Sequence, residues 1–246
     1  MIVFIPADPF LVNDYILDPS WTSQPYPGAF LPGGIWPPRH IDDIICTTSP
    51  KYIPCVGPTC YNNKSNPCRS PSCTHTLSAW KTATSDWEKY IELRATPDRG
   101  IGTYTKRAFR AGTILGWYAG AVKPTDAIPY GTNDYLMDME IGDIDLDTPA
   151  ESAYMGSIDA ETTGNWTRFI NHSCAADCVF SLKRVGKTRI MVVQAVKNIP
   201  SGKELSVDYG SSYYGLDSSK RCGCGAPECV EKKRRRLESA RKRKQV

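Results

Sequence analysis

No stretch of this 246-residue chain is apolar over the length that a membrane span requires. A transmembrane helix needs about 20 consecutive apolar residues, and no run approaches that length. The opening MIVFIPADPFLV lacks the basic segment of a secretory signal, and two prolines and an aspartate interrupt its apolar run. We therefore predict no membrane contact and no secretion, and we expect a reducing compartment, in which disulfides are rare.

Internal repeats are also missing, and nothing in the composition is typical of a fibrous or broadly disordered chain. The sequence is 41% apolar and 23% charged, which suits one good core with a smaller appended module. From Leu93 onward, short runs rich in Val, Ile and Tyr alternate with Gly, Pro and Asp, which predicts a mostly β domain. Before it, apolar residues recur every three or four positions and predict a helix over 76–92.

Positive charge is concentrated at one end. The formal net charge is +4, but residues 231–246 hold nine Lys or Arg and two Glu. That segment therefore carries +7 and the remainder about −3, so an acidic body precedes a basic tail. Such a tail is typical of a solvated helix or disordered end, or of a nuclear-import signal or nucleic-acid contact, and both interpretations can hold.

Ten cysteines form an early and a late group, and in a reducing compartment such groups indicate metal ligands before disulfides. In the late group, CGCGAPEC places Cys222, Cys224 and Cys229 at C-x-C-x4-C spacing. Because a structural zinc takes four ligands, a fourth must come from elsewhere. Both Cys174 and Cys178 qualify by spacing.

The early group predicts a second, separate zinc site. Its spacing is C-x4-C-x7-C-x4-C over Cys55, Cys60, Cys68 and Cys73. One zinc fits this pattern, with Cys46 or His75 as a spare ligand. A pair of disulfides is the alternative.

Two short motifs are weak by themselves. RGIG at 99–102 is a two-glycine turn that lacks the third glycine and the following helix of a dinucleotide-binding loop. The Asn-His-Ser within NWTRFINHSCAADC (165–178) suggests a nucleophilic serine. Residues adjacent in sequence seldom point together, however, so we reject that interpretation.

Taken in order, these pieces resemble the SET-domain protein lysine methyltransferases. The resemblance covers roughly residues 93–230 and rests on RGIGTYTKRAFRAGTILGWYAG, DYLMDM, IDAETTGNWTRFINHSC, ELSVDYG and CGCGAPEC. It implies a mostly β fold with few helices (α+β), in which small sheets surround a knot-like crossing of the RFINHSC and ELSVDY segments, with zinc-stabilised flanking segments. We accordingly divide the chain into a Pro- and aromatic-rich arm (1–45), a cysteine-rich pre-SET-like segment with the helix (46–92), a SET catalytic domain (93–214), a post-SET zinc segment (215–230) and the basic tail (231–246).

Members of this family use S-adenosylmethionine as the methyl donor. The resemblance implies that the donor contacts Gly100, Ile101, Gly102, Tyr135, Arg168, Phe169, Asn171 and His172. Tyr209 matches the catalytic tyrosine and Tyr118 is the second catalytic candidate, while Tyr118, Tyr135 and Val207 are expected in the substrate lysine channel. A narrow aromatic channel would lower the pKa of a lysine ammonium, which must lose a proton before it accepts a methyl group.

The resemblance also selects zinc ligands. In the family the cysteine of NHSC joins the three trailing cysteines, which implies one Zn²⁺ site of Cys174, Cys222, Cys224 and Cys229. Cys178 is then expected to be a free thiol. The early cysteines resemble the segment that precedes this domain in one group of histone methyltransferases. That segment has nine cysteines for three zincs, so five early cysteines allow at most one.

Three positions depart from the family pattern. Ala121 stands where a glutamate is frequent, and Ala176 with Asp177 replaces a Pro-Asn pair, which changes the hydrogen bonding of that loop. Val207 replaces the usual Phe or Tyr two positions before the catalytic tyrosine. Because a small apolar residue leaves room and removes a hydroxyl, we predict di- or trimethylation.

The sequence thus predicts a zinc-containing protein lysine methyltransferase that acts in the nucleus, on chromatin. A histone tail is the expected substrate, because an acidic body suits a basic peptide. One alternative is a methyltransferase of a non-histone protein. The other is a catalytically weak SET-like module that binds chromatin through its basic tail, which the retained Tyr209, Asn171 and His172 disfavour.

Overall fold

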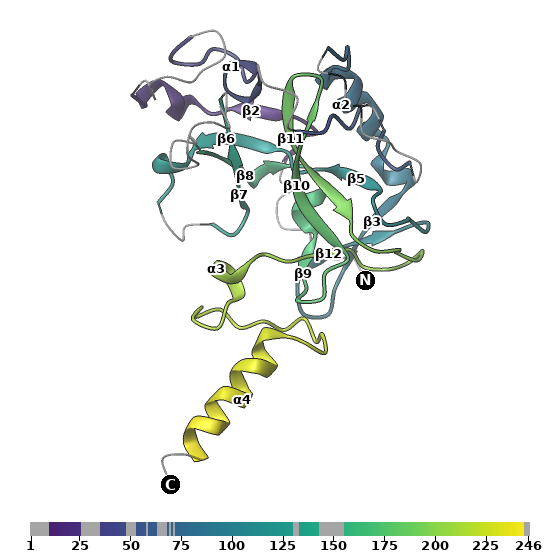
Figure 1. Ribbon diagram of the computed structural model, residues 1–246, viewed down its shortest axis with the longest axis vertical. Coiled ribbons are helices and arrows are strands. Elements are labelled where there is room, and N and C mark those ends of the chain that lie inside the picture. The colour runs from purple at the N-terminus through teal and green to yellow at the C-terminus, as the bar shows by residue number, and fades with distance from the viewer. Residues whose placement is uncertain are drawn as a thin grey trace.

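The computed structural model in Figure 1 is mostly β, with several small sheets and few helices, which confirms the predicted fold class. The structure describes residues 10–25, 35–47, 53–57, 59–62, 68, 70, 72–129, 133–142 and 155–243. Within these ranges, no helix combines the length and the apolar character needed to cross a membrane.

The largest sheet recruits strands from the amino-terminal segment. At its centre, β8 (Met155–Gly164) pairs antiparallel with β6 (Gly120–Pro124) and with β7 (Leu136–Glu140). Two short strands then add in parallel at the edges: β1 (Phe10–Leu11) pairs with β8 and β2 (Tyr15–Leu17) pairs with β6. Part of the predicted arm is therefore hydrogen-bonded into the sheet.

Two further sheets lie beside the first (Figure 1). One consists of β10 (Cys178–Val185), β11 (Thr188–Ala195) and β5 (Ile114–Trp117), all antiparallel. The other is the hairpin of β3 (Ile91–Ala95) and β4 (Ile101–Thr105). The β10–β11 hairpin is long, and its turn lies between α1 and α2 at the top of the view.

The helices are short except at the carboxyl end. They are η1 (Pro19–Ser23), α1 (Asp42–Ile45), α2 (Leu77–Ser85), η3 (Trp87–Lys89), η4 (Thr125–Ala127), η6 (Trp166–Phe169), α3 (Ser211–Tyr214) and α4 (Val230–Arg243). Thr76 caps α2 by accepting a hydrogen bond from the Ala79 amide, at 3.2 Å. The helix predicted over 76–92 is too long, because Ile91 already pairs with Thr105 in the β3–β4 hairpin.

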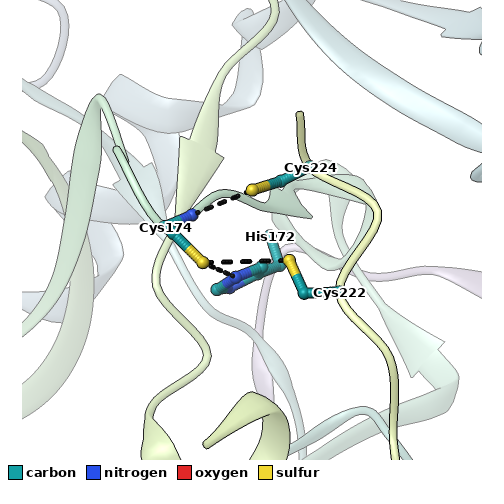
Figure 2. Close-up of side chains that lie close together, drawn as sticks. All are labelled: His172, Cys174, Cys222 and Cys224. Atoms are coloured by element: carbon teal, nitrogen blue, oxygen red, sulfur yellow. Dashed lines mark hydrogen bonds between the residues drawn. The ribbon is translucent and has the colours of Figure 1, made fainter. Parts of the chain in front are cut away.

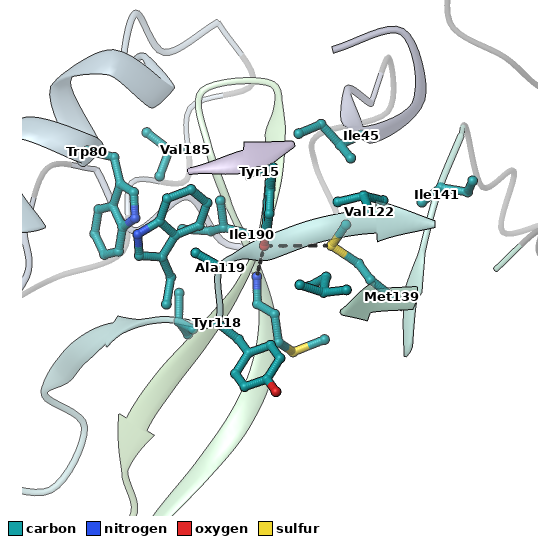
Figure 3. Packing of buried hydrophobic residues seen from close by; sticks show 14 of the residues in the cluster. Tyr15, Ile45, Trp80, Tyr118, Ala119, Val122, Met139, Ile141, Val185 and Ile190 are labelled. Carbon is teal, nitrogen blue, oxygen red and sulfur yellow. Dashed lines mark hydrogen bonds between the residues drawn. The ribbon is translucent and has the colours of Figure 1, made fainter. Parts of the chain in front are cut away.

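Two apolar clusters form the core. The first joins β2 to β5, β6, β8 and the β10–β11 hairpin (Figure 3). Tyr15 is buried there, and its hydroxyl accepts a hydrogen bond from the Met191 amide at 3.0 Å. The second cluster surrounds Trp166 and includes Val207. Gly116 allows close packing in this cluster, since a Cβ there would lie 2.6 Å from the Trp166 ring.

Candidate active site

The two segments predicted to cross do meet. β9 (Asn171–His172) pairs in parallel with β12 (Ser206–Val207), so the RFINHSC and ELSVDY segments lie side by side. Tyr209 lies two residues after the end of β12, and its amide donates a hydrogen bond to His172 Nδ1 at 3.1 Å. The crossing therefore places the matched catalytic tyrosine next to the matched donor-binding residues.

A cavity of about 1400 Å³ opens beside this crossing. Its volume exceeds the roughly 300–1,000 Å³ of ordinary small-molecule sites, so it has room for a cofactor and a substrate side chain. Of the residues predicted to serve the donor, the substrate and catalysis, those that line it are Gly100, Ile101, Tyr118, Tyr135, Arg168, Phe169, Asn171, His172 and Tyr209. Gly102 and Val207 do not line it: Gly102 faces Glu204, and Val207 is completely buried in β12.

Two tyrosine hydroxyls in the cavity wall are held by backbone carbonyls. Tyr118 Oη donates to the Tyr135 carbonyl at 2.7 Å, and Tyr209 Oη donates to the Ile170 carbonyl at 2.8 Å. Burial raises the pKa of both phenols above their ordinary value, and for each a neighbouring tyrosine adds to the rise. Both hydroxyls thus stay protonated at neutral pH, and each oxygen keeps lone pairs that can accept a hydrogen bond.

Sequence reasoning missed an aromatic pair that extends this wall. Tyr213 and Tyr214 in α3 line the cavity, with ring centroids 5.1 Å and 6.2 Å from Tyr209. Tyr214 also lies 4.6 Å from the His172 ring. The signal was the Tyr-Tyr doublet that follows ELSVDYG within one helical turn. An edge-on contact of Tyr118 with Phe180, at 5.3 Å, closes the wall on the side of the β10–β11 hairpin.

Arg168 and Asn171 are engaged with the protein itself. The Arg168 guanidinium donates to the Ala160 carbonyl at 2.6 Å and lies 4.3 Å over the Tyr135 ring. Asn171 Nδ2 donates to the Ile101 carbonyl at 3.2 Å. These contacts shape the cavity wall, because they hold Tyr135 and the turn that precedes β4.

A charged link joins the two sides of the cavity. Lys220 forms an ion pair with Asp134, and its ammonium lies 3.7 Å from the Tyr213 ring centroid. Burial alone would raise the pKa of Asp134, but hydrogen bonds from Lys220 and Tyr213 hold it below its usual value. The link holds the segment after α3 close to the segment before β7.

The late cysteines gather at the edge of the same cavity. Ligand atoms of His172, Cys174, Cys222 and Cys224 lie within 4.8 Å of one another (Figure 2). Cys174 and Cys222 Sγ are 3.8 Å apart, and two thiolates about 2.3 Å from a tetrahedral zinc would be separated by ~3.8 Å. The buried thiol of Cys229 contacts those of Cys222 and Cys224.

Backbone amides prepare these sulfurs to hold a cation. The Cys174 amide donates to Cys224 Sγ at 3.4 Å, and the Val230 amide donates to Cys174 Sγ at 3.5 Å. Burial alone would raise the pKa of the Cys224 thiol, but hydrogen bonds from the Cys174 and Ala226 amides and from the neighbouring thiols lower this pKa to about 7. The donor set therefore fits Zn²⁺, a soft-ligand tetrahedral ion.

His172, and not the predicted Cys229, completes this compact group of ligand atoms, and Cys229 Sγ lies 3.8 Å from the Cys222 carbonyl oxygen. His172 Nδ1 accepts the Tyr209 amide, so a neutral imidazole carries its proton on Nε2, which lies 3.3 Å from Cys174 Sγ. Burial lowers the pKa of His172, which favours this neutral ring. This tautomer lets Nε2 donate a hydrogen bond to Cys174 Sγ.

The remaining cysteines lie away from this group. Cys178 is a free thiol buried in β10, and burial raises its pKa to about 12. In the early group the structure brings Cys55 and Cys73 together with His75. It does not bring Cys60 to them, since Cys60 Sγ lies 3.5 Å from the Ile114 carbonyl.

Residues 100–210 match the sequence model of the SET domain. Together with the fold, the match shows that residues 100–210 form a SET domain, the domain of the lysine methyltransferase family that the sequence motifs resemble.

Several curated relatives carry the name histone-lysine N-methyltransferase. The protein trr of Drosophila melanogaster is 27% identical over 158 residues, which are 62% of this chain and 6% of that protein. The H3 lysine-36 specific enzyme of Mycosarcoma maydis is 44% identical over 73 residues, 30% of this chain and 7% of that protein. Drosophila ash1 is 30% identical over 147 residues, 56% of this chain and 6% of that protein. The chain thus spans only a small fraction of the length of these relatives.

Proposed function

We propose that this chain is an S-adenosylmethionine-dependent protein lysine N-methyltransferase that acts on a histone tail, and hence in the nucleus. The observation that carries the proposal is the pair of carbonyl-held hydroxyls, of Tyr118 and Tyr209, in one wall of a large cavity beside the β9–β12 crossing. The names of the relatives support the substrate class.

The turn before β4 suits close approach of a cofactor. Gly100 has φ +70°, which favours glycine, and nothing lies within 4 Å of the place a Cβ would occupy. Gly100 and Ile101 therefore present open backbone to the cavity. Phe169 and Tyr135 supply aromatic faces in the same cavity. When bound, S-adenosylmethionine supplies a methyl group on a positively charged sulfonium.

The tyrosines prepare the substrate lysine. An ammonium with a pKa of ~10.4 must lose its proton, and an aromatic, partly desolvated channel favours the neutral amine. Tyr209 Oη then accepts a hydrogen bond from the amine and orients the amine lone pair, while the Tyr209 hydroxyl keeps its proton and donates it in a hydrogen bond to the Ile170 carbonyl. Alignment of this kind is worth roughly 7 kcal/mol or more when the geometry is right. Tyr209 acts by position and not as the base.

The charge of the cavity supports a basic peptide as the substrate. Five carboxyl groups line it, against three arginines: Asp98, Asp134, Asp138, Glu161 and Asp208 against Arg99, Arg168 and Arg221. Such a net negative cavity attracts a lysine-rich tail and speeds its association.

For the product, we retain di- or trimethyllysine as the proposal. Val207 carries no hydroxyl and is fully buried, so this position neither narrows the cavity nor holds a water there. Tandem mass spectrometry after exhaustive reaction tests the point, and a product that stops at monomethyllysine refutes it.

For the basic tail, we propose contact with nucleic-acid phosphates. In α4, six cationic side chains are exposed: Lys232, Lys233, Arg235, Arg236, Arg241 and Arg243. The helix projects away from the body (Figure 1). Affinity for a DNA duplex should fall steeply with salt, and the slope should flatten when Arg235 and Arg236 are replaced by Gln. A salt-independent affinity would reject the proposal.

Transfer of a labelled methyl group to core histones tests the main proposal. We expect Tyr209→Phe to lower kcat by at least about 100-fold with little change in donor affinity, because the hydroxyl serves only the amine. Lys187→Met, an exposed change far from the cavity, is the matched control. Transfer only to non-histone proteins would favour the first alternative. Binding to nucleosomes without any transfer would favour the chromatin-binding module.

A further inference from the structure

We propose that Cys55, Cys68, Cys73 and His75 bind a structural Zn²⁺ that fastens the amino-terminal segment to the turn of the β10–β11 hairpin. All four residues precede the region that matches the SET-domain model. None of them lines the cavity. The proposed site is thus separate from the catalytic one.

Three ligand atoms already have the spacing of a zinc coordination shell. Cys55 Sγ lies 3.4 Å from His75 Nδ1 and 3.6 Å from Cys73 Sγ. Thiolate and imidazole ligands at about 2.3 Å and 2.0–2.1 Å from a tetrahedral zinc would be ~3.5–3.8 Å apart. A disulfide would instead hold two sulfurs at about 2.05 Å.

Cys68 is placed to be the fourth ligand. Its amide donates to the Cys55 carbonyl at 2.7 Å, and the Cys55 amide donates back to the Cys68 carbonyl at 3.3 Å. The two residues are therefore directly opposite each other in an antiparallel bridge. Side chains of such a pair lie on the same face, with Cβ atoms roughly 4.5–5.5 Å apart. A rotation about the Cys68 Cα–Cβ bond can then bring its sulfur to the ion.

The surroundings are built to hold thiolates. Amides of Gly57 and Gly186 both donate to Cys55 Sγ, each at 3.4 Å. The fully buried Arg184 donates from Nη1 to Cys73 Sγ at 3.4 Å. Zn²⁺ with three thiolates and a neutral imidazole carries a net charge of −1, which the Arg184 guanidinium balances.

Glycines make the close approach of His75 possible. Gly186 has φ +60°, and a Cβ there would lie 2.0 Å from the His75 carbonyl oxygen. Gly57 has φ +58°, and its Cβ would lie 3.3 Å from the His75 ring. Gly57 and Gly186, which come from different chain segments, both have left-handed backbone conformations and both pack closely against His75.

The ligand set differs from the one that spacing suggests. Cys60 belongs to the regular C-x4-C pattern, yet its sulfur faces the Ile114 carbonyl. His75, which the sequence offered as an additional candidate ligand, lies with Cys55 and Cys73 instead of Cys60. Cys46 lies near Asp42 and Thr188, at 3.7 Å and 3.9 Å from their side-chain oxygens.

Metal content of the full chain, purified under reducing conditions, tests the proposal. Native mass spectrometry should find two zincs per chain in the wild type. Cys73→Ser and His75→Ala should each lose one zinc and keep the other, whereas Cys60→Ser should keep both. Retention of both zincs in Cys73→Ser and His75→Ala would overturn the proposal.

Two measurements on the wild type decide the matter if these variants fail to fold. Cys68 and Cys73 are partly exposed, so both should resist alkylation until a chelator is added and then react. Immediate alkylation of both, or a mass 2 Da lower that indicates a Cys55–Cys73 disulfide, would overturn the proposal. The cobalt-substituted chain should show the charge-transfer absorption of thiolate ligation at two sites, and absorption for a single site would contradict it.

Discussion

The two cysteine-histidine groups lie at opposite ends of the β10 strand. Cys174 precedes β10, while Arg184 and Gly186 contact the early group at its far end. Eight residues of β-strand span about 26 Å. The same thiol chemistry therefore occurs twice, once at the cavity edge and once at the hairpin turn.

The two groups differ in what they hold in place. His172, Cys222 and Cys224 line the cavity, so loss of the late group directly alters its wall. The early group instead joins Cys55 and Cys73 to Arg184 and Gly186 at the hairpin turn, and none of its described residues lines the cavity. We therefore expect the late group to serve activity and the early group to serve stability, because the two groups have similar ligands but different positions in the fold.

The largest expected effect separates these two roles. Cys224→Ser should lower kcat/KM for methyl transfer by at least about 100-fold, because the post-SET segment would no longer be held at the cavity. Cys73→Ser should change kcat/KM by less than about threefold at 20 °C but lower the melting temperature. Cys46→Ser is the control for loss of a thiol. Equal falls in activity for both variants would contradict the division of roles.

Next in size is the effect of removing the buried cation at the hairpin end. Arg184→Met should lower the free energy of unfolding by about 3 kcal/mol, because it leaves buried acceptors and thiolates without their cation. Lys187→Met, an exposed change in the same turn, should stay within about 0.5 kcal/mol. Urea unfolding measures both. Similar losses for the two variants would show that Arg184 has no special role.

A smaller effect is expected at the cavity end from one arginine of the basic tail. Arg234 is buried, unlike its neighbours, and donates to the carbonyls of Gly215 at 2.6 Å and Ser218 at 3.2 Å. Arg234→Met should raise KM for a peptide substrate about tenfold, since the loop after α3 loosens. Arg235→Met changes an exposed position and should leave KM unaltered. The same KM for both variants would place Arg234 among the ordinary charges of the tail.

The smallest expected change concerns pH at the cavity end. Burial raises the pKa values of Tyr118 and Tyr209, so both hydroxyls keep their protons as pH rises through 10. A phenol with a raised pKa stays protonated to a higher pH than a free tyrosine does. We therefore expect that kcat/KM does not fall between pH 9 and 10. A pH–rate profile that falls with an apparent pKa near 9 would show that one of the two phenols ionises early.

Local sequence patterns and motifs were sufficient for the fold class and for the SET-domain resemblance. The RFINHSC and ELSVDY motifs are specific enough to reveal the family resemblance. The pairing of β9 with β12, which the resemblance implied, is present in the structure. Alternation of Val, Ile and Tyr with Gly, Pro and Asp was also enough to predict a mostly β domain. The motifs and the alternation depend on residues close together in the chain, whereas the β9–β12 pairing was expected only from the family resemblance.

Contacts between distant segments were decided only by tertiary structure. Spacing predicted Cys60 as a ligand, but the fold turns its sulfur to Ile114 and brings His75 to Cys55 instead. The Pro-rich arm showed no alternation that predicts parallel pairing, yet β2 adds to β6. Arg234 was indistinguishable from its basic neighbours until a loop folded over it. Spacing in sequence limits which residues can meet, whereas packing and hydrogen-bond satisfaction across the chain select which of them do.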